Sequence, residues 1–210
     1  MTTLSYDEQR KQENENRLLF IANTEKMATF IGAVPEPKYG CDTPFDFLEH
    51  TIERYRNSYD GFDENPDFQR GYVWTREQQI KYCEAVVRGT VGASALVITL
   101  NCPDFQRDQV KDSDLKGFVV VDGLQRLTAM RQFYRGEFRI FNDIFDGGAD
   151  FHFFKGTRFN LKSHSGFRFN IFNFQYKKDI LDYYLAFNNG GTVHSKEEIE
   201  RVTAMRKALD

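Results

Sequence analysis

Cysteine is scarce in this chain of 210 residues, which carries only Cys41, Cys83 and Cys102. They are widely spaced and form no Cys-x-x-Cys, which excludes a zinc ribbon, a thioredoxin-type motif and a dense disulfide framework. A chain of this length can bury roughly 70% of its unfolded surface, so it needs no covalent staple. We expect a reduced, cytoplasmic protein whose thiols are buried or inert.

Long apolar runs and an excess of one charge are also missing. No run approaches the ~18–20 apolar residues of a membrane helix, and residues 1–17 are too polar for a signal peptide. Lysine and arginine number 28 against 31 aspartates and glutamates, a net charge of −3. This balance excludes a basic nucleic-acid coat over the whole chain and a polyacidic mimic. No membrane partner is expected.

Several motifs that identify enzymes are absent. The chain has no G-x-x-x-x-G-K-[ST], no G-x-G-x-x-G after a strand, no H-E-x-x-H and no G-x-S-x-G. Residues 142–150 resemble a calcium loop, but Ile144 and Phe153 occupy positions that need oxygen ligands. The four histidines lie far apart in the sequence, which does not favour a histidine metal site.

What the chain does have is apolar residues, 40% of the total, with 21 phenylalanines. Helical spacing predicts helices over residues 45–58, 76–88, 124–135, 178–189 and 196–209. Buried strands are predicted over residues 95–100 and 118–121, and strands and loops over 138–176. This order is typical of an α+β domain. We expect an N-terminal extension over residues 1–30 and one domain over residues 31–210.

Capping signals support these helix limits. Thr43 and Pro44 are interpreted as the cap and first residue of the first helix. Thr75 and Gln78 form a capping box for the second helix, and Gly136 ends the third. In the late strand, Phe167, Phe169 and Ile171 should share one buried face.

The pattern with the clearest chemistry is a strand, a glycine turn and a helix over residues 119–127. The helix N-terminus offers free N–H groups and partial positive charge, which suits phosphate. Gly123 permits close approach of a ligand, and Arg126 adds a guanidinium fork. Asp122 could hold Mg²⁺ or orient a water. The alternative is that Asp122 only caps the helix and Arg126 only pairs with it.

These residues also resemble a known family. Asn65-Pro66 followed by Gln69-Arg70, and Gly123-x-x-Arg126-x-x-Ala129, are similar to the two boxes of ParB proteins. More closely, Phe68–Trp74 (FQRGYVW) and Asp122–Thr128 (DGLQRLT) resemble the ParB/sulfiredoxin-like N-terminal domain of GmrSD-type restriction proteins. The stretch Asn188–Ser195, followed by Glu197-Glu198, resembles that group's asparagine–glycine element. Similar short proteins are called ParB-like in phage genomes, which implies the cytoplasm of a bacterial or phage-infected cell.

The resemblance implies a ParB/sulfiredoxin-like mixed sheet with flanking helices, and a nucleoside triphosphate with Mg²⁺ as cofactors. It implies catalytic roles for Asp122, Gln125 and Arg126, with Asp122 as the candidate metal ligand. The phosphate-binding residues it implies are Gln69, Arg70, Gly123, Arg126, Asn188, Gly190, Gly191 and His194. The family usually has Gln where this chain has Leu124. Sulfinic-acid reduction is not expected, because the turn has no cysteine. GmrSD-type proteins carry a further helical domain and often an HNH-type nuclease domain, which these residues do not include.

A basic, aromatic stretch over residues 151–178 offers a second phosphate surface. It has no acidic residue and interleaves nine aromatic rings, as single-stranded nucleic acid requires. The alternative is a sheet whose phenylalanines form core while its cations are solvated. The candidate DNA-binding cations are Lys155, Arg158, Lys162, Arg168, Lys177 and Lys178.

Three functions stay open on the sequence. One is a Mg²⁺-dependent NTP hydrolase or DNA nickase; another is a nucleotide- and DNA-binding module without turnover. The third is a phage protein that uses the fold to block a host or defence component. Nucleotide and DNA are the expected partners, and a homodimer is one alternative for the oligomeric state.

Overall fold

The computed structural model describes residues 6–31, 35–105, 115–157, 159, 161, 166–189 and 196–210. The chain divides into two compact units, Met1–Glu36 and Pro37–Asp210. The first unit contains one long helix, α1 (Tyr6–Ile31). No helix in the described ranges combines the length and apolarity that crossing a membrane requires.

A five-stranded mixed sheet organises the second unit, in the order β1-β5-β3-β4-β2. The strands are β1 (Tyr39–Pro44), β2 (Phe62–Asp63), β3 (Val97–Asn101), β4 (Phe118–Asp122) and β5 (Gly166–Phe172). β1 pairs antiparallel with β5 and β3 antiparallel with β4, whereas β3–β5 and β2–β4 are parallel. The predicted α+β class with a mixed sheet and flanking helices is confirmed.

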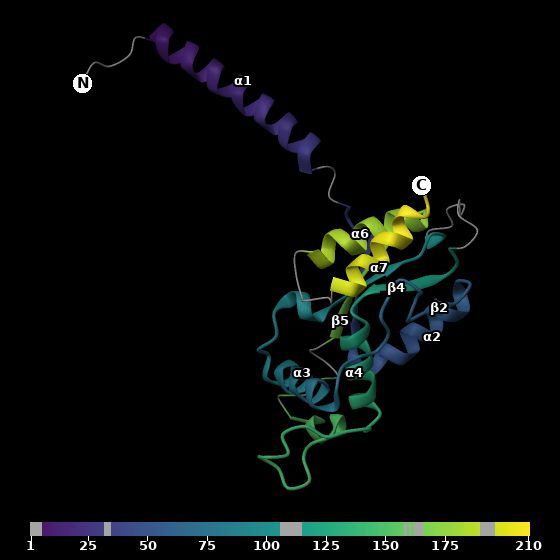
Figure 1. Ribbon diagram of the computed structural model, residues 1–210. Helices are drawn as coiled ribbons and strands as arrows, with labels where there is room; N and C mark the ends of the chain where they lie inside the picture. The colour runs from purple at the N-terminus through teal and green to yellow at the C-terminus, as the bar shows by residue number, and fades with distance from the viewer. Residues whose placement is uncertain are drawn as a thin grey trace. The chain divides into compact units, whose positions relative to one another are not determined.

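Helices cover both faces of this sheet (Figure 1). The larger core joins the sheet to α2 (Leu48–Ser58), α3 (Arg76–Arg88) and α4 (Leu124–Tyr134). Its fully buried rings include Phe45, Phe118, Phe133, Phe167 and Phe169. The other face carries α6 (Lys177–Asn189) and α7 (Lys196–Lys207), which pack through Ile180, Leu181 and Val202 onto Val121. As predicted, Phe167, Phe169 and Ile171 point together into the core.

Local capping signals place several helix ends correctly. Thr75 Oγ1 accepts from the N–H of Gln78, and the Gln78 side chain accepts from the N–H of Thr75, so the capping box is confirmed. Gly89 then ends α3 in the left-handed conformation. Short 3₁₀ segments connect other elements, at Phe45–Phe47, Ala93–Leu96 and Phe151–Phe154. The strand predicted from residue 95 therefore starts two residues later.

The interpretation of Thr43 and Pro44 as a helix start is wrong. Both belong to β1, where Thr43 is buried and pairs with Phe167 of β5. The following 3₁₀ turn has no side-chain cap, and α2 begins only at Leu48. Thr43 takes the strand because its pairing with β5 satisfies the backbone that a cap would otherwise serve.

All three cysteines are free. Cys83 and Cys102 are buried, and burial raises the pKa of each thiol well above its ordinary value. Both side chains therefore stay protonated and unreactive at neutral pH. Cys41 is partly exposed on β1.

Candidate functional site

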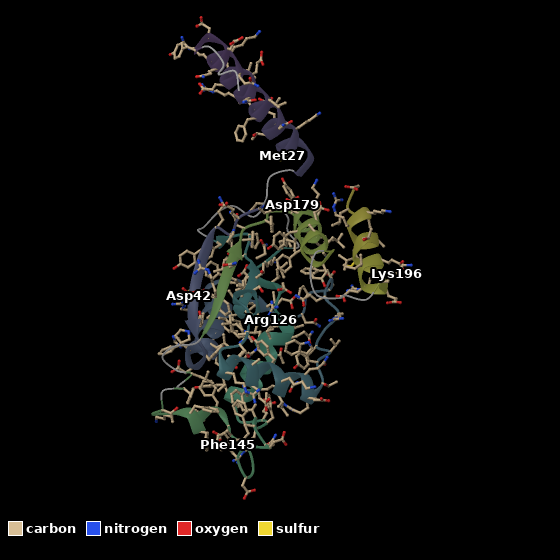
Figure 2. The ribbon with its side chains drawn as sticks, turned by 90° about the vertical axis from the view of Figure 1, so that its left-hand side faces the viewer. Met27, Asp42, Arg126, Phe145, Asp179 and Lys196 are labelled. Carbon is tan, nitrogen blue, oxygen red and sulfur yellow. The ribbon has the colours of Figure 1, made fainter. Side chains whose placement is uncertain are left out.

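A small cavity lies where β4 ends and α4 begins. It holds about 100 Å³ and lies between the β4–α4 turn, the segment 69–74, and residues of α6 and α7. In Figure 2, Arg126 lies between the strand that carries Asp42 and the helix that carries Lys196. The lining residues are Gln69, Arg70, Trp74, Val121, Asp122, Gly123, Leu124, Gln125, Arg126, Tyr184 and Glu198. The fold thus brings the Gln69-Arg70 block beside the Asp122–Arg126 block, 53 positions later along the chain.

Gly123 makes the sharp turn between strand and helix. Its φ is +104°, a conformation that side chains strongly disfavour. A Cβ there would lie 2.6 Å from Cδ1 of Ile98, so the turn packs directly on β3. Gly123 is also the N-cap of α4, without a side-chain cap bond, so Asp122 does not cap this helix. The first N–H groups of α4 lack intrahelical partners and carry the positive end of the helix dipole.

Arg126 lies one turn into α4 and points back to Asp122. Its Nη2 donates to Asp122 Oδ2 at 2.5 Å and to the carbonyl of Val97 at 3.0 Å. The two side chains are 20% and 23% exposed, so a ligand in the cavity can reach both. Nε of Arg126 is buried and has no hydrogen-bond partner among the described residues. The Nε–H donor of this guanidinium is therefore not used by any described residue.

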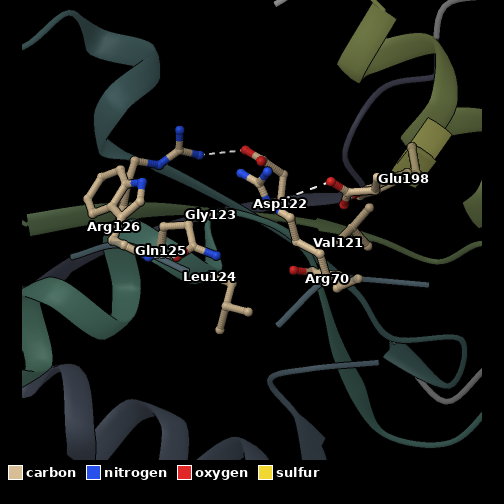
Figure 3. A pocket seen from close by; sticks show the side chains of 11 residues that line it. Arg70, Val121, Asp122, Gly123, Leu124, Gln125, Arg126 and Glu198 are labelled. Carbon is tan, nitrogen blue, oxygen red and sulfur yellow. Dashed lines mark hydrogen bonds and ion pairs between the residues drawn. The ribbon is translucent and has the colours of Figure 1, made fainter. Parts of the chain in front are cut away.

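A second ion pair lines the cavity. Arg70 Nε lies 3.5 Å from Glu198 Oε2, and the Glu198 carboxylate is almost fully buried. Tyr184 donates its hydroxyl to Glu198 Oε1 at 2.7 Å. Burial raises the pKa of Tyr184 most, and the hydrogen bond to Glu198 and that carboxylate's charge raise it further, so Tyr184 stays a neutral donor. Figure 3 shows the two pairs, with Arg126 directed at Asp122 and Arg70 at Glu198.

Two glutamines hold the backbone around these pairs. The Gln125 oxygen accepts from the N–H groups of Val73 and Trp74 at 2.9 and 3.1 Å, and its nitrogen donates to the Gly71 carbonyl at 2.8 Å. Gln69 donates through Nε2 to the carbonyl of Val120. The Gln125 amide thus bonds to the backbone just after Arg70, and the Gln69 amide bonds to the backbone of β4. Their geometry is that of positioning residues.

Trp74 contributes an aromatic wall to the cavity. It is half-buried, packs against the large core, and its ring lies 5.3 Å from that of Tyr82. Tyr82 donates to the carbonyl of Ala95 at 2.9 Å. Trp74 is therefore mainly a core residue, with one edge on the cavity.

Other predicted site residues lie elsewhere or outside the described part. Gly190, Gly191, His194, Arg158 and Lys162, and the side chain of Asn188, are outside the described residues. The described cations of the basic stretch lie on three separate elements. Lys155 follows a 3₁₀ turn, Arg168 on β5 lies 3.3 Å from Asp42, and Lys177 at the start of α6 lies 2.7 Å from Asp67. Lys178 lies 6.0 Å from the ring of Tyr176.

Sequence reasoning missed Glu198 and Tyr184 as site residues. Glu198 is the third residue of α7, where a glutamate ordinarily completes a capping box. Its near-complete burial is the distinguishing feature, because glutamate is almost never fully buried unless it is paired. A tyrosine fourteen residues earlier on another helix gives no local signal at all.

The cavity offers two carboxylates to a metal. In the described ranges, no cluster of three or more histidine, cysteine, aspartate or glutamate side chains could hold an ion by itself. Magnesium, however, is usually bound by one or two carboxylates together with substrate phosphates. Asp122 and Glu198 fit that requirement, since both line the cavity. The donor set suits a Mg²⁺ ion that arrives with a phosphate ligand.

Comparison with known proteins identifies the family. No curated protein and no solved structure matches the chain. The family model described as GmrSD restriction endonuclease, N-terminal domain, matches residues 48–207, which include every element from α2 to α7. The match spans both ion pairs and the turn between them. The chain therefore belongs to the family of GmrSD restriction endonuclease N-terminal domains.

Proposed function

We propose that the cavity at the start of α4 binds the phosphate groups of a nucleoside triphosphate. The observation that carries the proposal is the placement of two arginines, each paired with a carboxylate, around one cavity at a helix N-terminus. Guanidinium forks and helix N–H groups are the donors that phosphate oxygens prefer. The geometry supports positioning of a charged group more directly than it supports any particular bond cleavage.

The size of the cavity defines which part of the ligand it takes. Pockets that enclose whole small molecules usually measure about 300–1,000 Å³, whereas this one holds about 100 Å³. A phosphate chain fits such a volume, and the sugar and base would extend from its mouth. Trp74, which lines the cavity, offers its ring to the part of the ligand that emerges.

Binding would exchange ion-pair partners within the site. A phosphate that takes the guanidinium of Arg126 competes with Asp122 for Nη2. The Asp122 carboxylate then becomes available as a metal ligand. Arg70 is 35% exposed and could swing from Glu198 to a phosphate with little loss of packing.

Mg²⁺-dependent turnover is the second candidate. Asp122 and Glu198 would hold Mg²⁺, which supplies charge neutralisation on the phosphate oxygens. Arg126 would orient the phosphate, while Gln125 keeps the segment 71–74 in place. The restriction-endonuclease family supports DNA as a partner of this domain, with hydrolysis of the triphosphate or nicking of DNA as the reaction.

The test is calorimetric titration of the full chain with each of the four common NTPs in Mg²⁺, together with phosphate release. Arg126→Gln should weaken binding about 10- to 150-fold, as for a lost hydrogen bond to a charged group. Arg135, at the C-terminal end of α4, pairs with Glu49 and does not line the cavity. The control variant Arg135→Gln therefore removes the same charge as Arg126→Gln but should bind nucleotide like wild type. Nicking of supercoiled plasmid is measured in parallel, with and without EDTA.

Two results would contradict the proposal. Arg126→Gln could bind nucleotide like wild type, which would place the phosphate elsewhere. Alternatively, Arg135→Gln could lose as much affinity as Arg126→Gln although circular dichroism shows both variants folded, which would make the loss an effect of net charge alone. Phosphate release that persists in EDTA would remove Mg²⁺ from the account but leave the binding claim intact.

A further inference from the structure

A second, larger cavity lies on the same unit away from the two ion pairs. It holds about 340 Å³ and is lined by Tyr39, Cys41, Arg54, Tyr55, Ser58, Tyr59 and Phe105. These residues come from β1, from α2 and its end, and from the segment after β3. Its volume falls within the ~300–1,000 Å³ of pockets that enclose small ligands.

Aromatic rings form most of its wall. Tyr39 lies 5.7 Å from Phe105, and Tyr59 lies 6.0 Å from Phe105 in a nearly parallel arrangement. Behind them, Phe118 of the buried core contacts Tyr59, Tyr55 and Phe105, so the wall rests on a rigid base. Tyr39 remains 49% exposed and presents an accessible ring on an edge strand. The rings of Tyr55, Tyr59 and Phe105 are thus held in place before any ligand arrives.

Arg54 gives the described lining of this cavity a positive charge. Its lining contains no aspartate or glutamate. The guanidinium of Arg54 lies 5.6 Å from the Tyr55 ring, and no described carboxylate pairs with it. Arg56, two residues along the same helix, instead pairs with Glu53 at 2.9 Å and Glu64 at 3.5 Å. Among the described residues, Arg54 is therefore an arginine without a carboxylate partner beside an aromatic wall.

We propose that this cavity binds a nucleobase that carries a phosphate, with the base against the rings of Tyr39, Tyr59 and Phe105 and the phosphate on Arg54. Every base offers a flat face for aromatic stacking, and a cation beside the stack holds the backbone phosphate. An aromatic cage for a cationic ligand is the competing chemistry, but the charge of Arg54 would repel such a ligand. Burial raises the pKa of Tyr55 to about 12, so its hydroxyl is a neutral hydrogen-bonding group at the floor.

The site is separate from the phosphate cavity. Phe118, under the aromatic wall, and Asp122, at the ion pairs, are the two ends of β4. At about 3.3 Å per residue they lie roughly 13 Å apart along the strand. Changes at sites more than about 7–10 Å apart are usually independent. Binding at this cavity is therefore independent of the function proposed for the first cavity.

The test uses fluorescence anisotropy of the full chain with a labelled 12-nucleotide single strand of mixed sequence. Tyr39→Leu should weaken binding about 5- to 150-fold, as for one lost stacking contact. Tyr39→Phe keeps the ring and should bind like wild type. Arg54→Gln should lower the slope of log affinity against log salt by about 0.7, whereas the matched Arg56→Gln should leave it unchanged. Circular dichroism verifies that each variant folds.

Competition identifies the source of the base. Displacement of the strand by ATP, in wild type and equally in Arg126→Gln, would identify a free nucleotide as the ligand. Retention of the strand against ATP but loss to unlabelled single strand would identify an unpaired base of DNA. Tyr39→Leu binding as tightly as Tyr39→Phe, Arg54→Gln keeping the wild-type slope, or no binding of either probe would overturn the proposal.

Discussion

The side-chain oxygen of Gln125 accepts the backbone N–H of Trp74 at 3.1 Å. The same amide also contacts Val73 and Gly71, so the first turn of α4 is tied to the segment that follows Arg70. One glutamine thus links the helix that carries Arg126 to the segment that follows Arg70. This relationship makes Gln125 a positioning residue in our account.

Replacing Gln125 should therefore cost stability. Gln125→Leu removes three hydrogen bonds, each worth about 0.5–1.5 kcal/mol net, so we expect the unfolding free energy to fall by roughly 1.5–4.5 kcal/mol. Urea denaturation measures it. Gln132→Leu, on the same helix with one exposed bond to Arg76, should change it far less. A Gln125→Leu variant as stable as wild type would contradict the positioning role.

Replacing Gly123 with any residue that has a side chain should destabilise the fold. Gly123→Ala combines a left-handed backbone with a Cβ 2.6 Å from Ile98, and strain of this kind costs of order 1–3 kcal/mol before the clash is added. Gly136→Ala is the matched control, because its φ is +72° and no atom lies within 4 Å of the added Cβ. The thermal midpoint of Gly123→Ala should fall further than that of Gly136→Ala. Equal losses would mean that backbone conformation alone decides.

The buried carboxylate of Glu198 should affect the pKa of Tyr184. Burial raises the pKa of Tyr184 first, and Glu198 adds to it through a hydrogen bond and its negative charge. Glu198→Gln removes that charge, so the pKa should move down toward, but not reach, the ordinary value of a tyrosine. Absorbance of tyrosinate, corrected with Tyr184→Phe, measures the change. Glu197→Gln, on the exposed side of α7, should leave the pKa of Tyr184 unchanged. An unchanged pKa of Tyr184 in Glu198→Gln would contradict the pairing of these two residues.

Acid should weaken the contact between α2 and α4. Glu49 accepts from Arg131 at 2.7 and 2.9 Å and from Arg135 at 2.7 Å. Burial alone would raise the pKa of Glu49, but the hydrogen bonds and charges of the two arginines outweigh it and hold the pKa below its ordinary value. A lowered folded-state pKa gives stability that is complete above the unfolded-state pKa and is lost as pH falls through the folded-state pKa.

Glu49→Gln should therefore be less stable than wild type at pH 7, with the difference shrinking below about pH 4.5. Urea denaturation over a pH series measures the two curves. Glu53→Gln, an exposed change on the same helix, should follow wild type throughout. Parallel curves for Glu49→Gln and wild type would show that the arginines contribute nothing to acid sensitivity.

Local signals in the sequence predicted the fold well where neighbours along the chain decide the structure. The Thr75–Gln78 box and Gly89 bound α3 because both act within one helical turn. β1 escaped prediction because its residues include Gly40, Asp42 and Pro44, and its partner β5 lies more than 120 positions away. An edge strand of this composition is stabilised by pairing, which one segment of sequence does not reveal.

The same division applies to the candidate site. Gly123 and Arg126 were predictable because strand, turn and helix follow one another directly. The meeting of Arg70 with Glu198 depends on how α7 packs across the sheet, and the Tyr184 contact depends on α6 as well. The family resemblance predicted that these sequence blocks share one site. The ion-pair partners could be identified only from the three-dimensional structure.

The most direct test of the central claim is a crystal structure of the full chain with a non-hydrolysable nucleoside triphosphate analogue and Mg²⁺. The account predicts phosphate oxygens about 2.7–2.9 Å from the Arg126 guanidinium, beside the first N–H groups of α4, with Asp122 released toward the metal. Density for the phosphates at another place, while Arg126 remains paired with Asp122 as in the free chain, would contradict it.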